Sequence, residues 1–340
     1  MMNVPSVGIG ILNWNGRKYL EQFLPFLQHL SYINYTVYLI DNASSDDSVA
    51  FVKKSHPWVK IIETGGNYGV AGGYNIGFAQ MPETYVLMLN SDVEVTPNFL
   101  EPLIEILESD PTIAACQSKL LSYEKRDEYE YGGAAGGLID VLGYSFCRGR
   151  LFTTVEKDLS QYKTGQIFWG GGACLMIRKS AYEAVKGMYD YFFMHFEEVD
   201  LCWKFYSAGY KVFYCNESVV YHMGGGSLSY QSPRKTFYNF KNNLVMCVRN
   251  SPWSYKIWWL PVRMLTDSLS LLFYLFKGEG ANAKSVVKAY MGFFKWWFTE
   301  KNKYPEKQLS LLEIDTTFKS SIIAQYFLAG KKIYSDIKGK

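Results

Sequence analysis

Tyr-Val-Leu-Met-Leu-Asn-Ser-Asp-Val-Glu-Val, residues Tyr85–Val95, is the stretch that decides the fold. Its first part, Tyr85–Leu89, is an apolar run without alternation, which predicts a strand buried on both faces. The run stops at three polar residues, Asn90–Asp92. Ligands of open α/β sheets bind beyond the carboxyl ends of the strands, so Asp92 is expected where a metal ion and its phosphates would lie. Taken alone, the same residues also fit a simple turn before a helix opened by Pro97.

Three further apolar runs precede this stretch and predict strands at Val7–Leu12, Thr36–Ile40 and Val59–Ile62. Helix-like segments at Arg17–Leu30 and Asp47–Lys54 separate them. This β-α-β-α-β order predicts a parallel sheet with right-handed crossovers. Polar residues that follow successive strands then meet at one edge of the sheet, where a ligand can bind.

A glycine-rich segment, residues 65–77, follows the third predicted strand. Glycine lets a backbone approach a ligand, and a helix that begins near Ala71 presents N–H groups that lack helical partners. A flexible loop is the alternative interpretation. The segment is not a P-loop, because no Gly-Lys-Ser/Thr closes it, and it lacks the Gly-x-Gly-x-x-Gly spacing of a dinucleotide site.

The composition limits the classes of protein that need to be considered. A chain of 340 residues suffices for one large α/β domain with an appendage, or for two modest domains. Its net charge of +3 is too small to indicate nucleic-acid binding. The six cysteines are scattered, so we expect neither a zinc site nor a disulfide framework. The first residues lack the features of a signal peptide, and we expect a cytoplasmic protein.

Three acids, Glu197, Glu198 and Asp200, follow the aromatic cluster Tyr191–Phe196. Apolar residues at helical spacing from Leu201 onward place these acids in the first turn of a helix. Favourable interaction with the helix dipole explains some acidic residues at this position. Three acids within four residues are more than this interaction accounts for. Nearby aromatic residues raise the pKa of a carboxyl by desolvation, as a general base requires. The pattern leaves open which of the three would act.

Other segments allow two interpretations each. Ile167–Ser180 is a glycine-rich turn that feeds a strand, which fits a ligand-contacting loop or a tight crossing of strands. His222 precedes glycines at residues 224–226, yet a single histidine is more often structural than a ligand. Residues 123–164 are charged and then rich in glycine and aromatics, and we assign them to a variable region near an acceptor.

Four segments occur in the order Asn13–Gly16, Ile40–Asp46, Asn67–Gly77 and Leu89–Asp92. Together they resemble the nucleotide-sugar-binding half of the family-2 inverting glycosyltransferases, rhamnosyltransferase-like members above all. The resemblance implies an α/β fold of GT-A type, with a mostly parallel, Rossmann-like sheet flanked by helices. The catalytic domain would span residues 1–230, with a nucleotide-sugar half at about 1–121 and an acceptor half at about 122–230. The implied reaction moves a sugar, rhamnose or a hexose, from a nucleotide diphosphate to a hydroxyl with inversion.

The resemblance also implies roles for single residues. Asp92 would hold Mn²⁺ or Mg²⁺, and His222 would complete the metal or diphosphate site. The second acid of the family's Glu-Asp-x-Asp motif, taken as the base, corresponds to Glu198, with Glu197 and Asp200 beside it. Donor contacts are implied for Asn13, Asn15, Asp41, Asn67, Gly72, Gly73, Asn75, Asn90 and Lys241. Acceptor contacts are implied for Trp169, Gly172 and Ala173.

The last third of the chain is rich in aromatic and apolar residues. Ile257–Phe276 contains Arg263 and Asp267, which argues against a simple transmembrane helix. Both charges lie on the more polar side of the segment, so the helix is expected to be amphipathic. Lys284–Phe298 shows the same separation of polar and apolar sides. Tryptophan and lysine on such helices favour a membrane surface over mutual packing. We therefore expect residues 231–340 to be helical, and the protein to lie peripherally on the inner face of the cell membrane.

The sequence does not name the substrates, the linkage or the oligomeric state. A dTDP-, UDP- or GDP-sugar would serve as donor, and a polyprenyl-linked surface glycan is the acceptor that the family and the composition favour. A sugar-phosphate nucleotidyltransferase is an alternative, but a basic glycine-rich signature would be expected where Asn13–Gly16 stands. A catalytically inactive binding protein is another, and the retained Asp92, Glu198 and His222 count against it.

Overall fold

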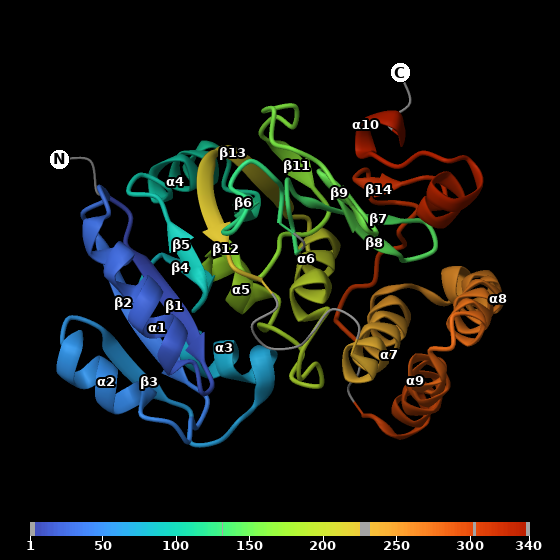
Figure 1. Ribbon diagram of the computed structural model, residues 1–340, viewed down its shortest axis with the longest axis horizontal. Coiled ribbons are helices and arrows are strands. Elements are labelled where there is room, and N and C mark those ends of the chain that lie inside the picture. Colours follow the sequence, from blue (N-terminus) through green and yellow to red (C-terminus); the bar gives the residue numbers. More distant parts are fainter. Residues whose placement is uncertain (1–3, 131, 225–231, 302–303, 338–340) are drawn as a thin grey trace.

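The computed structural model describes residues 4–130, 132–224, 232–301 and 304–337 (Figure 1). Within them a nine-stranded sheet has the order β11-β13-β6-β12-β4-β1-β2-β3, and β5 pairs with β13. The strands of this main sheet are β1 (Val7–Asn13), β2 (Tyr35–Asp41), β3 (Lys60–Glu63), β4 (Tyr85–Asn90), β5 (Val93–Val95), β6 (Ile113–Ser122), β11 (Gly165–Ile167), β12 (Cys174–Arg178) and β13 (Lys211–His222).

The N-terminal half of the main sheet is parallel, as predicted. Strand β1 lies between β2 and β4, and Val7 pairs with Tyr35 on one side and Tyr85 on the other. Beyond β4 the sheet is mixed, because β12 runs antiparallel to both β4 and β6. The carboxyl ends of β1, β2 and β4 therefore meet at one edge, which places the polar residues that follow them side by side.

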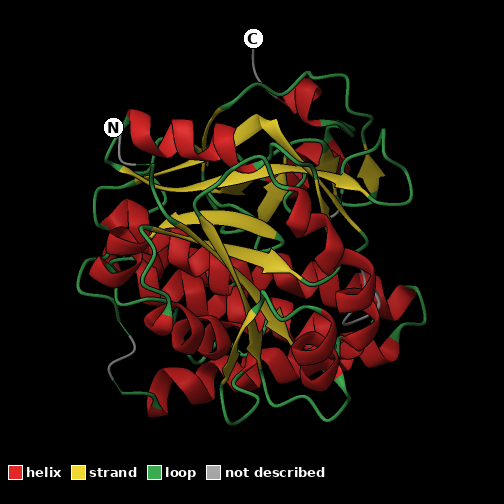
Figure 2. Cartoon of the chain, turned by 90° about the vertical axis from the view of Figure 1, so that its left-hand side faces the viewer, coloured by secondary structure: helices red, strands yellow, loops and turns green. Residues whose placement is uncertain are grey.

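Helices cover both faces of the main sheet (Figure 2). Alternate residues of β4 divide between two cores: Val86 and Met88 pack with residues of α3 and α6, whereas Leu87 and Leu89 pack with residues of α1 and α4. The predicted helix at Arg17–Leu30 ends early and continues as a 3₁₀ turn, Leu24–His29, in which Pro25 lacks the N–H that an α-helix needs. The helices of this part are α1 (Arg17–Phe23), α2 (Ser48–Ser55), α3 (Gly69–Gln80), α4 (Leu100–Ser109), α5 (Lys179–Ala184) and α6 (Glu197–Ser207).

Residues 123–164 form most of a second, smaller sheet with the order β10-β9-β8-β7-β14. Its strands are β7 (Gly137–Asp140), β8 (Ser145–Cys147), β9 (Arg150–Leu151), β10 (Thr154–Val155) and β14 (Thr317–Phe318). Strand β14 comes from the C-terminal part of the chain, and Ile322 and Tyr326 pack beside it against Leu138 and Leu151. The end of the chain thus returns to the middle of the sequence.

Three long helices, α7 (Pro233–Asn250), α8 (Trp253–Phe276) and α9 (Gly280–Thr299), form a bundle beside the sheets (Figure 1), and a short helix α10 (Tyr334–Ile337) follows. Helix α9 packs on α7 and α8. Within the described ranges, no helix is long and apolar enough to cross a membrane. The predicted domain boundary at residue 230 and the glycines at 225 and 226 lie outside the described residues.

Candidate active site

A cavity of about 970 Å³ lies beyond the carboxyl ends of β1 and β4. Residues that follow these strands line one part of it, and residues from the start of α6 line another. Residues of the second sheet and of α7 complete the wall. A space of this size accommodates a ligand larger than a single sugar, since ligand sites in proteins commonly measure about 300–1,000 Å³.

The loops after β1 and β2 are tied together by side chains at the edge of the sheet. Asn13 Nδ2 donates to Asp41 Oδ1 at 3.0 Å, and the Ser44 hydroxyl donates to the same oxygen at 2.6 Å. Asn15 Oδ1 accepts hydrogen bonds from the backbone N–H of Ser45 and of Asp46. Asn15 lines the cavity, whereas Asn13 and Asp41 are buried behind the wall and hold these loops in place.

Gly69 brings the glycine-rich segment against the loop that precedes α6. Its φ of +70° is a left-handed conformation, and a Cβ there would lie 2.2 Å from the carbonyl oxygen of Phe193. The N–H of the next residue, Val70, donates to that same oxygen at 2.8 Å. Asn67 Oδ1 accepts the Gly69 N–H at 3.0 Å, and Asn67, Gly69 and Val70 line the cavity. Only glycine fits at position 69 without moving Phe193.

Other predicted donor residues of this segment hold α3 in place instead of lining the cavity. A Cβ on Gly73 would lie 2.5 Å from Leu12 Cδ1, so this glycine lets α3 approach β1 closely. Gly72 lies in the same helix. Asn75 accepts the Met188 N–H at 2.9 Å and donates to the Met188 carbonyl at 3.0 Å. These residues position the cavity wall from behind.

Asp92, which follows β4, meets His222 at the end of β13. His222 Nε2 lies 3.1 Å from Asp92 Oδ1, and Nδ1 lies 3.3 Å from Glu130 Oε2. Asn90 Nδ2 lies 3.3 Å from the same Nε2. Burial lowers the pKa of His222, but the hydrogen bonds and charges of Asp92 and Glu130 outweigh it and raise the pKa to about 10. All four side chains line the cavity.

Asp92 and His222 fit a divalent cation by donor type and spacing, provided that the imidazole first releases the proton that it shares with Asp92. Two neighbouring ligands at about 2.1 Å from an octahedral ion lie about 3 Å apart, which matches the observed oxygen–nitrogen distance. Glu130 stands behind His222 as the carboxylate that commonly orients a ligating imidazole. No group of three His, Cys, Asp or Glu side chains that could hold a metal occurs in the described ranges. Among the described residues, Asp92 and His222 would thus supply two ligands, and substrate oxygens and water could occupy further positions.

Glu197 and Glu198 open α6 directly after a strained turn. His195 and Phe196 have φ values of 66° and 73°, a left-handed conformation that is unfavourable for residues other than glycine. Both glutamates line the cavity, and each has one buried carboxyl oxygen that finds no hydrogen-bond partner among the described residues. Burial raises the pKa of both side chains, and the charge of Glu198 raises that of Glu197 further.

Asp200 lies in the same first turn, but its surroundings differ from those of the glutamates. It is fully buried, and both of its oxygens lie within 2.9 Å of Arg249 Nη1. Asn250 Nδ2 donates to Asp200 Oδ1 at 2.6 Å. Asp200 does not line the cavity. This carboxylate therefore fastens α6 to α7, and of the three acids in this turn the two glutamates face the cavity.

Comparison with known sequences identifies the family. The sequence model of "Glycosyl transferase family 2" matches residues 8–186, more than half of the chain. The chain belongs to glycosyltransferase family 2. A relative from Mycobacterium tuberculosis, N-acetylglucosaminyl-diphospho-decaprenol L-rhamnosyltransferase, is 26% identical over 273 residues, which cover 74% of this chain and 87% of the relative. Rhamnosyltransferase WbbL of Escherichia coli is 27% identical over 158 residues, which cover 44% of this chain and 59% of WbbL.

Solved structures agree with the family in their fold. The mannosyltransferase PcManGT from Pyrobaculum calidifontis, in complex with GDP-Man and Mn²⁺, superposes with a TM-score of 0.55 at 12% identity, and the match covers 88% of this chain and 89% of that one. GalNAc-T7 with UDP, GalNAc and Mn²⁺ gives a TM-score of 0.58 at 16% identity, covering 88% of this chain and 57% of that one. These likenesses confirm the GT-A-type fold of this glycosyltransferase.

The acceptor residues implied for this glycosyltransferase lie in the cavity wall. Trp169, Gly172 and Ala173 line it between β11 and β12. Trp169 is fixed, because its Nε1 donates to the Leu138 carbonyl at 2.9 Å and its ring fills the space that a Cβ on Gly137 would need. Lys241, which was assigned to the donor, lies outside the lining and faces the rings of aromatic residues, with its Nζ 4.5 Å from the centre of the Tyr191 ring.

Several residues of the wall carried no recognisable sequence signal. Glu130 belongs to the segment that was assigned only loosely to an acceptor region, and Arg263 was interpreted as part of a helix stripe. Arg150 of β9 and Arg234 and Lys235 of α7 also line the cavity. These three cations stand far apart from Asp92 in the sequence, so no local motif could have joined them.

Proposed function

We propose that this glycosyltransferase moves a sugar from a nucleotide diphosphate to a hydroxyl of a glycan acceptor, with inversion at the anomeric carbon. One observation carries the proposal: the glutamates that open α6 and Asp92 beyond β4 line the same cavity. A single displacement needs a base for the acceptor hydroxyl and stabilisation of the departing diphosphate, and these two groups can supply them.

Glu198 is our choice for the base. Glu197 is only 6% exposed, and burial together with its neighbour's charge favours its protonated form more strongly. A base must be ionised near neutral pH, which suits Glu198 better. As the acceptor oxygen attacks the anomeric carbon, Glu198 takes its proton, and the bond between that carbon and the diphosphate oxygen breaks. Asp200, which is paired with Arg249, would keep α6 in place against α7.

Asp92 and His222 would hold Mn²⁺ or Mg²⁺. Such an ion, when bound, stabilises the charge that develops on the departing diphosphate. The distance between the Asp92 carboxylate oxygen and the His222 imidazole nitrogen supports this assignment. Asn90 lies beside the same nitrogen. Mn²⁺ tolerates a nitrogen ligand better than Mg²⁺ does, which favours it at a site that contains a histidine.

We further propose a dTDP-, UDP- or GDP-sugar as donor, with dTDP-rhamnose first among them because two relatives are rhamnosyltransferases. The acceptor would be a polyprenyl-linked glycan in the synthesis of a surface polysaccharide, as the name of the mycobacterial relative suggests for that protein. An acceptor anchored in a bilayer would place the enzyme peripherally on the inner face of the cell membrane.

Thermal unfolding with a panel of nucleotide sugars tests the donor and the metal together. We expect the unfolding midpoint to rise with one donor in the presence of Mn²⁺ or Mg²⁺, and the rise to disappear with chelator. Asp92→Asn should abolish the metal-dependent part, whereas Asp127→Asn, a matched change at an exposed acid outside the cavity, should not. A donor shift that is insensitive to metal would refute the role of Asp92, and no shift with any donor would favour an inactive, binding-only protein.

A further inference from the structure

Helix α8 is largely inverted: its three charged residues face the protein together with Tyr255 and Trp259, and most of its large apolar residues face outward. A helix on the surface of a soluble protein normally turns its apolar stripe toward the core. In α8 the buried residues include Lys256, Arg263 and Asp267. The large apolar side chains that are exposed include Ile257, Leu265, Leu269, Leu272, Phe273 and Phe276, and the exposed fractions of Leu265 and Phe276 are 66% and 90%.

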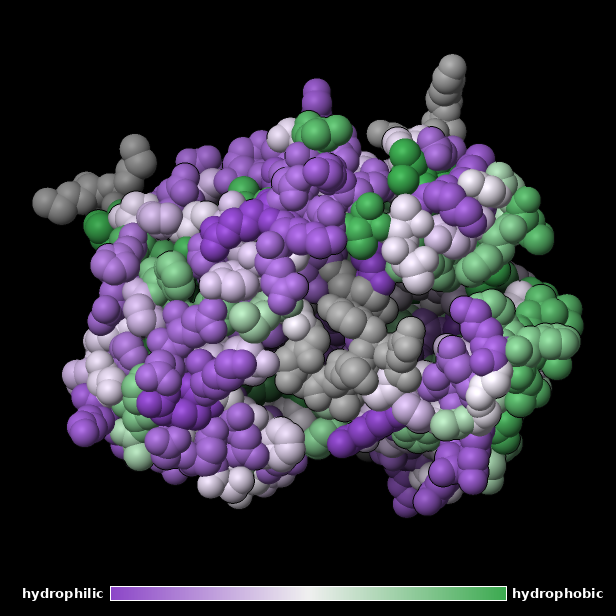
Figure 3. All heavy atoms as spheres, viewed as in Figure 1, coloured by the Kyte–Doolittle hydropathy of each residue, from purple (hydrophilic) through white to green (hydrophobic). Residues whose placement is uncertain are grey.

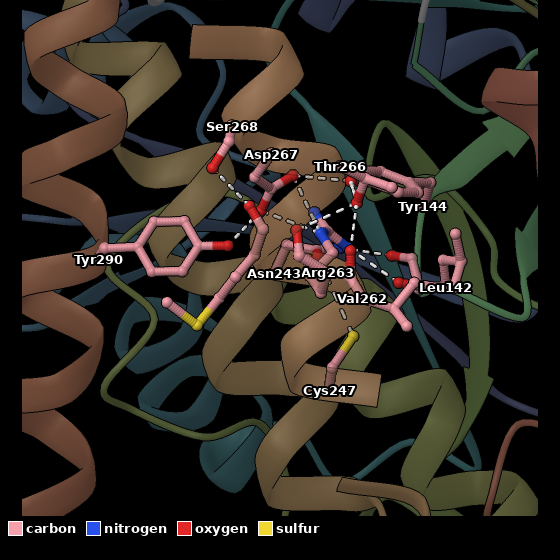
Figure 4. Close-up of polar contacts among 12 residues, drawn as sticks. Leu142, Tyr144, Asn243, Cys247, Val262, Arg263, Thr266, Asp267, Ser268 and Tyr290 are labelled. Carbon is pink, nitrogen blue, oxygen red and sulfur yellow. Dashed lines mark hydrogen bonds and ion pairs between the residues drawn. The ribbon is translucent and has the colours of Figure 1, made fainter. Parts of the chain in front are cut away.

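The inward face of α8 is a closed polar network (Figure 4). Arg263 Nε lies 3.0 Å from both carboxyl oxygens of Asp267, and Arg263 Nη1 donates to the Leu142 carbonyl at 3.0 Å. The hydroxyls of Tyr144 and Tyr290 donate to Asp267 at 2.7 and 2.8 Å. Buried charges are tolerated when they are paired and hydrogen-bonded in this way. The network therefore fixes the rotation of α8 and leaves its apolar side pointing outward.

The outward face of α8 belongs to a larger apolar surface. In Figure 3, hydrophobic residues gather along the edge of the molecule where Figure 1 shows α8, and they continue toward the C-terminal part of the chain. There Phe327 and Leu328 are exposed. Contiguous apolar surface of this kind marks an interaction site in a soluble protein.

Basic residues border this surface. Lys277 follows the last turn of α8, and its Nζ lies 4.7 Å from the centre of the Phe273 ring. Lys332 Nζ lies 3.8 Å from the centre of the Tyr326 ring, next to Phe327. Asp267 is the single acidic residue within α8, and it is buried. Apolar and aromatic side chains with lysines at their margin match the boundary between the acyl chains and the anionic head groups of a bilayer.

We infer that the outward face of α8 inserts into the interfacial layer of an anionic lipid bilayer, with the helix lying parallel to the membrane plane. The opposite face is buried against the protein from Tyr255 to Asp267, so this part of α8 can enter the bilayer on one side only. This inference deepens the proposed function, because it names the surface by which the enzyme reaches a lipid-linked acceptor.

The inverted helix also connects the bilayer with the cavity. Arg263 and Tyr144, which meet on the inward side of α8, both line the cavity. An α-helix with its side chains is about 10–12 Å across. The outward face of α8 therefore places a lipid surface about one helix diameter from the wall of the cavity, within reach of a glycan whose lipid anchor stays in the bilayer.

Flotation of the full chain with vesicles tests the inference without any donor or acceptor. We expect the protein to float with phosphatidylcholine vesicles that contain phosphatidylglycerol, and to float less at high salt. The double variant Leu265→Glu/Leu269→Glu should lower the partition coefficient by about ten-fold or more for each leucine, since burial of one leucine is worth at least one such factor. Ile33→Glu is the matched control, because Ile33 is an 84% exposed apolar residue distant in the fold. Binding that is unchanged in the double variant would overturn the inference.

A labelling experiment gives a second readout that does not require a charge change. All six cysteines are buried, so Leu265→Cys can be labelled selectively with a polarity-sensitive dye. We expect a blue shift on addition of the same vesicles, and no shift for the dye on Ile33→Cys. If neither dye responds, and if sedimentation instead shows a dimer that Leu265→Glu/Leu269→Glu dissociates, the surface binds a second copy of the chain and the inference is wrong.

These outcomes can be separated from those for the proposed function. The double variant should keep the donor-dependent rise in unfolding midpoint, because both leucines point away from the cavity. Vesicle binding without any donor shift would support the membrane surface and contradict the proposed function. A donor shift without vesicle binding would support the proposed function and contradict the membrane surface.

Discussion

The carboxyl edge of the main sheet and helix α8 place their polar residues in opposite ways. In β4, apolar residues are buried and the polar residues that follow them open onto a cavity. In α8, the charged residues Arg263 and Asp267 are buried and apolar residues face outward. Both arrangements obey one rule, that a buried polar group needs partners. The difference teaches that an apolar run locates a strand reliably, whereas charges in a helix do not reveal which side faces water.

The largest effect is expected at the edge of the sheet, from Glu198→Gln. If Glu198 is the base, kcat should fall by about 10²- to 10⁴-fold while donor binding persists, because the amide cannot take a proton. Single-turnover kinetics and the donor thermal shift measure the two quantities. Glu183→Gln, at an exposed glutamate of α5, is the matched control. Full activity of Glu198→Gln would move the base to Glu197.

The next effect concerns the inward face of α8. Asp267→Ala leaves Arg263 buried without its carboxylate, which should lower the free energy of unfolding by about 3–5 kcal/mol. Leu265→Ala, two residues away on the outward face, should change it by about 0.5 kcal/mol or less. Denaturant unfolding of the two variants measures the contrast. Equal stabilities would mean that the two faces of α8 do not differ as the structure shows.

A smaller effect is expected where the glycine-rich segment meets the α6 loop. Gly69→Ala should lower the free energy of unfolding by about 1–3 kcal/mol, because φ is positive and the new Cβ meets the Phe193 carbonyl. Gly65 has a φ of +78°, and a Cβ built on it would have no atom of the described residues within 4 Å apart from its chain neighbours, so Gly65→Ala isolates the cost of the backbone conformation. Thermal or denaturant unfolding of both variants gives the difference. If Gly69→Ala is no worse than Gly65→Ala, the contact with Phe193 contributes nothing.

The smallest effects concern pH. Because the pKa of Glu198 is raised, kcat/KM should decline below an apparent pKa higher than that of an ordinary glutamate, by about ten-fold per pH unit. The raised pKa also links stability to pH. The protonated carboxyl is compatible with burial, so its contribution to the free energy of unfolding is fully present at low pH and is lost as pH rises through the folded-state pKa. Glu198→Gln should therefore raise the unfolding midpoint at neutral pH and leave it unchanged well below pH 4.5. An unshifted acidic limb in the wild-type profile would contradict the burial of this carboxyl.

Much of the fold could be predicted from the sequence, because strands and helices follow local periodicity. The parallel order of β2, β1 and β4 follows from short strands separated by helices. The position of Asp92 beyond β4 follows from the abrupt end of an apolar run. The second sheet could not be predicted, since β14 pairs with β7 across about half of the length of the chain.

The candidate site divides in the same way. The sequence placed three acids in the first turn of α6, and the fold decided that Glu197 and Glu198 line the cavity while Arg249 binds Asp200. Successive helix residues are about 100° apart, so acids two positions apart face different neighbours. Glu130 had no signal at all, because its role depends on His222, which lies far along the chain.

By itself, then, the sequence determined the elements and the chemistry available at their ends: an α/β sheet, a carboxylate beyond β4, acids at the start of α6, and charged, apolar helices near the C-terminus. Only the tertiary structure decided which acid is held in an ion pair, which carboxylate supports His222, and which side of α8 points outward. The physical reason is that periodicity is set by the local backbone. The partners that satisfy a buried charge come from residues distant in the sequence, and folding alone brings them together.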